Sequence, residues 1–324
     1  MQELLSALTV LFRELPWLWV GIVFVLSLLV GSFLNVVIYR LPIMLDRQWR
    51  AQAEEILKEE PPDSKNAGRA HPAKQTDTKA SESTSAAPYN LVVPRSACPH
   101  CGAQITAWQN IPVISYLFLR GKCASCDARI SLRYPIVELV TAILSALVAW
   151  KFGFGWYTAA ALVFTWTLIA LSGIDIDHHL LPDNMTLPLL WLGLLVSLVP
   201  ASNVPGLPVD PRSSILGAVA GYLALWGVYH VFKLLTGKEG MGYGDFKLLA
   251  ALGAWLGWQQ LPLVILLSAF TGAVLGTALI AARRHERGAP IGFGPYLSAA
   301  GWIALMWGND LISAYFRLSG IARS

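Results

Sequence analysis

Four cysteines form two C-x2-C pairs, Cys98 with Cys101 and Cys123 with Cys126. The spacing of the pairs is close to that of zinc ribbons, in which four thiolates complete a tetrahedral shell around a structural Zn²⁺. Because no coordination position remains for water, such a zinc would stabilise the fold. Four free thiols or a redox-active C-x2-C pair are the alternatives, and we interpret His100 as a bystander.

Acidic residues stand at the ends of two apolar segments that are far apart in the chain. Asp175 and Asp177 end one segment, and Asp245 follows Gly242 and Gly244 at the start of the other. Two carboxylates that come within a few ångströms share one proton. The ionised one can activate water while the protonated one polarises a scissile carbonyl. Glycines would let a substrate backbone come close. The pattern favours a paired-aspartate protease.

Other interpretations of the acidic residues stay open. Asp183 precedes an apolar segment and could be a helix N-cap, whereas Asp177 could simply be solvated. A metal site could form from Asp175, Asp177, His178, His179 and Asp183. A nucleotide-binding loop is weakly supported, because no strand precedes the glycines before Asp245. The competing class is a non-enzymatic membrane protein, either a transporter or a scaffold that carries a zinc ribbon.

Composition defines the environment of these groups. The chain has 324 residues, of which 55% are hydrophobic and 14% charged, and its mean hydropathy is +0.53. A soluble domain usually carries about 25% charged residues. The chain is therefore an integral membrane protein, and its 13 Trp residues suit membrane interfaces. A net charge of only +4 gives no support for a nucleic-acid partner.

Apolar segments predict an all-α, polytopic protein with about eight transmembrane helices. The block over 246–281 is too long for one crossing, which needs roughly 20 residues, and we divide it near Pro262. The short segment after Asp245 suggests that this aspartate already lies below the membrane surface. The predicted segments are 17–39, 135–152, 156–174, 184–200, 213–235, 246–258, 261–281 and 294–316.

A polar insert separates the first apolar segment from the others. Within it we expect an amphipathic helix over 46–60, a disordered linker over 61–88 and a four-cysteine zinc module over 95–130. Most of the Lys and Arg residues lie in the insert and in loops on its side of the membrane. The insert is therefore expected in the cytoplasm and both termini in the periplasm. The predicted domains are a first transmembrane helix (1–40), the insert (41–134) and a transmembrane protease domain (135–324).

Five stretches of the chain resemble the bacterial type IV prepilin peptidases, which are leader peptidases and N-methyltransferases. The last of them carries the G-x-G-D signature of intramembrane aspartyl proteases. Together they run through nearly the whole chain in the family's order, although the linker over 61–88 is longer and more polar than expected. The matching stretches are 31–42, 98–126, 133–138, 175–183 and 242–247.

The resemblance implies an inner-membrane enzyme that cleaves the basic leader of type IV prepilins and type II secretion pseudopilins at the cytoplasmic face. The enzyme then methylates the new N-terminal residue, usually Phe, with S-adenosylmethionine. The matched catalytic pair is Asp175 and Asp245. Asp177 is the rival for the first position, and we prefer Asp175 because it ends the apolar run. No motif locates the binding site of the methyl donor.

Further residues near these motifs are candidates for supporting roles. Gly242, Gly244 and Lys247 are expected to contact the substrate. Glu138, just inside the second apolar segment, could pair with Arg133, bind a substrate amine or contribute to methyl transfer. Asn35 in the first segment could form a hydrogen bond to another helix. The lipid bilayer is the other expected partner, and no nucleic-acid partner is expected.

Overall fold

The computed structural model describes residues 2–59, 89–106, 108–199, 208–238, 240–281 and 292–319. Helices dominate this part of the chain, so the all-α fold class is confirmed, and each of the eight predicted segments forms a helix. These helices are α2 (Pro16–Glu59), α4 (Arg133–Phe152), α5 (Trp156–His178), α6 (Asp183–Ser197), α7 (Pro211–Thr236), α8 (Tyr243–Leu256), α9 (Leu261–Ala281) and α10 (Gly294–Leu318).

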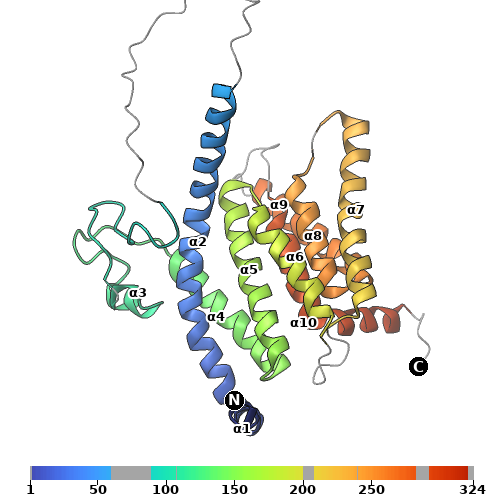
Figure 1. Ribbon diagram of the computed structural model, residues 1–324, viewed down its shortest axis with the longest axis horizontal. Helices are drawn as coiled ribbons and strands as arrows, with labels where there is room; N and C mark the ends of the chain where they lie inside the picture. The colour runs from blue at the N-terminus through green and yellow to red at the C-terminus, as the bar shows by residue number, and fades with distance from the viewer. Residues whose placement is uncertain are drawn as a thin grey trace, which may run out of the picture.

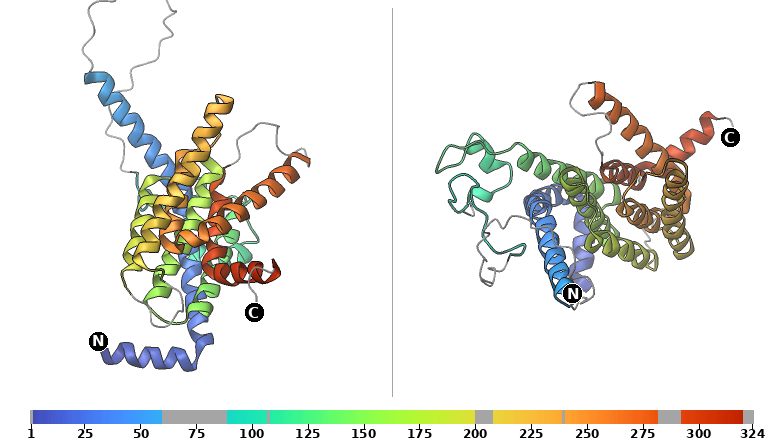
Figure 2. Two further views of the ribbon diagram at one scale, coloured as in Figure 1. Left: turned by 90° about the vertical axis from the view of Figure 1, so that its right-hand side faces the viewer. Right: turned by 90° about the horizontal axis from the view of Figure 1, so that it is seen from above.

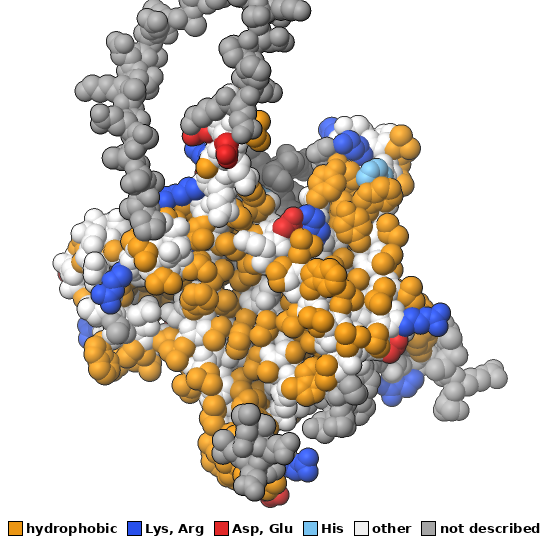
Figure 3. All heavy atoms as spheres, in the orientation of Figure 1, with side chains coloured by type: hydrophobic (Ala, Val, Ile, Leu, Met, Phe, Trp, Pro, Cys, Tyr) orange, Lys and Arg blue, Asp and Glu red, His pale blue; other side chains and the backbone are white. Residues whose placement is uncertain are grey.

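Within the described residues, five helices are long and apolar enough to cross a membrane: α2, α4, α5, α7 and the helical stretch Trp258–Ala278. By contrast, α6 and α8 have only 15 and 14 residues, which gives about 20 Å at 1.5 Å per residue. These two short helices contact each other and α7, while α2, α4 and α5 form the other side of the bundle (Figures 1 and 2). Hydrophobic side chains cover most of the face in Figure 3.

Helix α2 is much longer than the first predicted segment. It continues without a break through Pro42 to Glu59, so the helix expected over 46–60 is present up to Glu59, as the last part of α2. A proline removes one helical hydrogen bond but does not always end a helix. Here the neighbouring side chains of Ile38 and Leu41 are buried, and this packing holds α2 against the bundle. The predicted linker over 61–88 lies outside the described residues.

The first helix, α1 (Gln2–Glu14), was not among the predicted segments. Figure 2 shows α1 lying across the end of the bundle, roughly perpendicular to α2. Phe12 holds it there, because its ring lies 5.2 Å from that of Trp19 and 5.0 Å from that of Phe154. The predicted break before Pro262 is confirmed, since the 3-10 helix η2 (Trp258–Gln260) separates α8 from α9.

Helices α7 and α8 approach each other at a pair of glycines. A Cβ atom added to Gly217 would overlap the carbonyl oxygen of Gly253, and a Cβ atom on Gly253 would overlap that of Gly217. Small residues at such a crossing allow two backbones into van der Waals contact, which stabilises helix pairs in membranes. This contact fixes α8, and therefore Asp245 near its start, against the long helix α7.

We expect Gly253→Ala to destabilise the bundle by at least about 1–3 kcal/mol, because the added methyl group can be accommodated only by separating the two helices. Gly227→Ala is the matched control, since nothing lies within 4 Å of a Cβ atom at that position of α7. The measurement is thermal unfolding in detergent, followed by tryptophan fluorescence. Equal unfolding temperatures for the two variants would contradict the close helix contact.

Candidate active site and metal centre

Asp175 and Asp245 come together from two helix ends. Asp175 lies in the last turn of α5, and Asp245 is the third residue of α8. Their residues are only 4% and 6% exposed, and the two carboxylates are close enough for the charge of Asp175 to act on Asp245. Gly242, the N-cap of α8, is extended, and its carbonyl accepts a hydrogen bond from the Asp245 N–H at 3.2 Å. The structure thus forms the carboxylate pair that the spacing of the motifs suggested.

The beginning of α10 completes the surroundings of Asp175. The backbone N–H of Gly294 donates to Asp175 Oδ2 at 3.0 Å. A Cβ atom on Gly292 would overlap the Asp175 carboxylate, and one on Gly294 would lie 2.9 Å from Oδ2. These two glycines were not among the predicted site residues. Their signal was a Gly-x-Gly-Pro run before an apolar segment, because proline favours the first turn of a helix.

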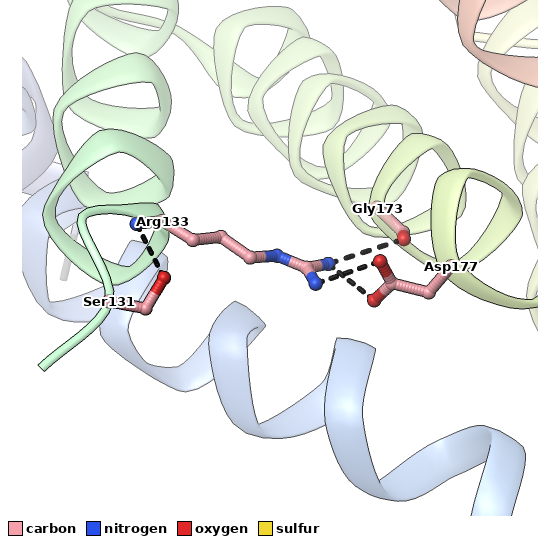
Figure 4. A network of polar contacts seen from close by, with 4 residues as sticks. All are labelled: Ser131, Arg133, Gly173 and Asp177. Atoms are coloured by element: carbon pink, nitrogen blue, oxygen red, sulfur yellow. Dashed lines mark hydrogen bonds and ion pairs between the residues drawn. The ribbon is translucent and has the colours of Figure 1, made fainter. Parts of the chain in front are cut away.

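Asp177 faces another direction on α5. Its carboxylate forms a bidentate ion pair with Arg133 at the start of α4, with N–O distances of 2.8 and 2.6 Å (Figure 4). Arg133 also donates to the carbonyl of Gly173 at 3.4 Å. Asp177 therefore joins α4 to α5, whereas Asp175, two residues earlier, lies beside Asp245.

A second ion pair joins Asp183, which follows Asp175 in the sequence, to Lys247, which follows Asp245. Lys247 Nζ lies 2.7 and 2.6 Å from the two carboxylate oxygens of Asp183. The expected N-cap role of Asp183 is wrong, because Pro182 is the N-cap and Asp183 already belongs to the first turn of α6. An added Cβ atom on Gly244 would lie 2.7 Å from Leu181 Cβ, whereas one on Gly242 would have the Asp245 carboxylate at 3.8 Å as its nearest contact.

The four cysteines lie together in the insert. Their sulfur atoms are all within 4.8 Å of one another, and Cys98 Sγ lies 3.8 Å from Cys126 Sγ. Elsewhere in the described chain no three His, Cys, Asp or Glu side chains meet in this way, so the alternative metal site around Asp175 does not form among these residues. His100 is not in the sulfur cluster, in agreement with its interpretation as a bystander.

Each cysteine pair sits on a tight turn of the same construction. Cys98 N–H donates to Ala103 O and Cys123 N–H to Ala128 O, both at 2.9 Å. Gly102 and Asp127, at the corresponding places in the two turns, have positive φ angles of 72° and 56°. Backbone N–H groups of Cys101 and His100 lower the pKa of Cys98 to about 6. This arrangement fits a Zn²⁺ ion held by four thiolates.

Two buried polar side chains form hydrogen bonds between segments: Glu138 binds the insert to α4, and Asn35 joins α2 to α4. Glu138 does not pair with Arg133, contrary to one of its expected roles. Its Oε2 instead accepts the backbone N–H of Val113 in the insert at 2.8 Å. Asn35 donates from α2 to the carbonyl of Tyr134 at 3.2 Å, which confirms the hydrogen bond between helices that its position suggested.

The helix bundle, the buried aspartate pair and the four-cysteine module define a multi-pass membrane protein with features of an intramembrane aspartyl protease. Residues 25–152 match the model of the bacterial peptidase A24 N-terminal domain, and residues 162–277 match that of the type IV leader peptidase family. The chain belongs to this family of leader peptidases. No solved structure matches it significantly.

Curated relatives cover almost the entire chain. A protein of Aeromonas hydrophila is 53% identical over 311 residues, which is 96% of this chain and 98% of the relative. Relatives from Stutzerimonas stutzeri and Pseudomonas aeruginosa are 55% and 53% identical, and each alignment covers 94% of this chain and 96% of the relative. All three are named prepilin leader peptidase/N-methyltransferase.

Replacing Cys98 with Ser should remove most of the bound zinc and loosen the insert, because the incomplete thiolate shell no longer supplies the folding energy of metal binding. His100→Ala should keep one zinc per chain, since His100 lies in the same turn but outside the sulfur cluster. Elemental analysis of the purified variants measures this. A wild-type protein without zinc, or equal loss from both variants, would contradict the four-thiolate centre.

Proposed function

We propose that the protein removes the leader peptides of type IV prepilins at the cytoplasmic face of the inner membrane and then methylates the new N-terminal residue, usually Phe. Zn²⁺ is the structural cofactor and S-adenosylmethionine the methyl donor. The names of the curated relatives support both activities. The observation that carries the proposal is the burial of Asp175 and Asp245 side by side at the ends of α5 and α8. Pseudopilins of type II secretion are the second substrate class.

Asp175 is the better candidate for the base of the pair. The Gly294 N–H donates to its carboxylate, and a hydrogen bond to a carboxylate favours its charged form. With Asp175 ionised, the shared proton resides on Asp245. Asp175 then accepts a proton from the attacking water while Asp245 donates a hydrogen bond to the scissile carbonyl. The tetrahedral intermediate collapses when the leaving amine receives a proton from the pair.

The ion pair of Asp177 with Arg133 supports assigning the first catalytic position to Asp175. The bidentate contact with both guanidinium nitrogens holds the Asp177 carboxylate in one orientation. Its interaction with Arg133, instead of with Asp245, fits a role in holding α4 against α5.

We assign the three residues around Asp245 different parts of substrate binding. Gly242 leaves space next to the carboxylate, so an extended substrate backbone can approach there. Gly244 lets the start of α8 pack against Leu181 and so shapes the same side of the proposed substrate site. Lys247, paired with Asp183, fixes α6 beside α8 and borders the path of the substrate.

We infer the orientation of the protein from the same end of the bundle. The insert enters α4 at Arg133, which contacts the α5 end that carries Asp175. Insert and aspartate pair therefore belong to one side of the membrane, and we place that side in the cytoplasm, with both termini in the periplasm. The division into a first transmembrane helix (1–40), an insert (41–134) and a protease domain (135–324) completes the proposal.

Asp175→Asn and Asp245→Asn should each lower leader cleavage by about 100- to 10,000-fold, because each removes one member of the acid–base pair. Asp177→Asn is the matched control on the same helix turn and should retain cleavage. Product masses measure cleavage, and thermal unfolding verifies that the variants are folded. An active Asp175→Asn together with an inactive Asp177→Asn would show that Asp177, and not Asp175, is the first catalytic aspartate. An inactive wild-type protein would favour a transporter or scaffold.

Hydrolysis and methylation should use different residues. Hydrolysis needs a proton and a water molecule, whereas methylation needs a free amine and S-adenosylmethionine. A folded Asp245→Asn protein should therefore still methylate a synthetic peptide that already begins with the mature Phe. Transfer of a labelled methyl group to this peptide measures the activity. Loss of both activities by a variant that still binds the donor would contradict this prediction and indicate that the two reactions use a single shared site.

A further inference from the structure

The insert carries an apolar surface that the proposed chemistry does not use. It consists of Trp108 in the 3-10 helix η1 (Trp108–Asn110) and of Ile114, Leu117 and Phe118 in α3 (Ile114–Phe118). Trp108 is 81% exposed, Leu117 69% and Phe118 84%. Figure 3 shows hydrophobic side chains on this edge of the molecule. Large side chains gathered on one exposed surface mark a contact with a membrane or a protein.

The depth of α3 is set by its attachment to α4. The backbone N–H of Val113, directly before α3, donates to Glu138 Oε2. Glu138 follows Arg133, the first residue of α4, by five positions, which is about 7.5 Å along the helix. Arg133 and Asp177 form an exposed ion pair at the helix ends and so mark the edge of the apolar region. The hydrogen bond to Glu138 therefore places the start of α3 beside the first turns of α4.

The surface of α3 continues the lipid-facing surface of the bundle. Figure 1 shows α3 alongside the region of α2 and α4, and not beyond the end of α4. On α4, Ile136 and Ile143 are also exposed, as expected of residues that face acyl chains. The short helix and the neighbouring span thus present apolar side chains at overlapping depths.

Charges next to α3 favour a lipid surface over an apolar protein partner. Arg120 and Lys122 lie shortly after α3, and Arg129, just after the second cysteine turn, is paired with Lys122 through a backbone β-bridge. Asp127 is the acidic residue among them. Basic residues near an apolar anchor are attracted to anionic headgroups close to the membrane surface. Tryptophan at position 108 fits the same interface.

We propose that α3 and Trp108 form a lipid anchor that inserts into the cytoplasmic leaflet and binds anionic phospholipid with the basic residues behind it. The hydrogen bond between Glu138 and Val113 attaches this anchor to α4 and so fixes its depth in the membrane. The four-cysteine module is then fixed against the membrane surface, beside α2 and α4. The proposal depends on the depth of α3 and is independent of the proteolytic mechanism.

A spin label at position 118 tests the anchor without using cysteine chemistry. Phe118 is replaced by a genetically encoded keto-phenylalanine that carries a nitroxide, and the protein is placed in nanodiscs of phosphatidylcholine and phosphatidylglycerol. The control position is Leu57, which is 71% exposed on the part of α2 that projects beyond the bundle (Figure 1). Collision rates with oxygen and with a water-soluble nickel chelate report the surroundings of each label. Zinc content verifies that the module is folded.

The label at 118 should collide more often with oxygen than with the nickel chelate, and the label at Leu57 should show the reverse. A second label at Leu117 should behave like that at 118. Nickel accessibility at 118 equal to that at Leu57 would show that α3 projects into water and would overturn the proposal. Low accessibility to both reagents would also overturn it, because a protein partner or a second copy of the chain would then cover α3.

Discussion

The structure depends on keeping two carboxyl groups together inside an apolar bundle. An isolated charge in such surroundings is costly, so each carboxyl group needs a neighbour that shares a proton or donates a hydrogen bond. Asp175 has both, because Asp245 lies beside it and the Gly294 N–H points at it. Three helices must meet at one point for this, and the contact between Gly217 and Gly253 keeps α8 in place for that meeting.

Polar contacts of the same kind connect the insert to the membrane helices. Arg40, buried near the middle of α2, donates to the carbonyls of Asn90 and Pro94 at 3.0 and 2.7 Å. Glu138 accepts a hydrogen bond from the backbone N–H of Val113, which lies between the two cysteine pairs. The module is therefore attached both before and after its first cysteine pair. This double attachment explains how a segment with little hydrophobic core of its own can keep a defined position beside α2 and α4.

Much of this arrangement could be predicted from local sequence patterns. Apolar length gave the eight helical segments, Pro262 marked the break between α8 and α9, and the two C-x2-C pairs indicated the zinc module. Contacts between distant segments could not be read in this way. The continuation of α2 through Pro42, the pairing of Asp183 with Lys247 and the approach of Gly292 and Gly294 to Asp175 each depend on which helices become neighbours, and a single sequence does not specify that.

The most direct test of the account is the mass of a prepilin after incubation with the purified protein, with and without S-adenosylmethionine. The account predicts a product that lacks only its leader when the donor is absent, and the same product one methyl group heavier when the donor is present. It also predicts that the uncleaved precursor never gains a methyl group, because the amine that accepts it is released by cleavage. An intact prepilin in both reactions, or a methylated precursor that retains its leader, would contradict the account.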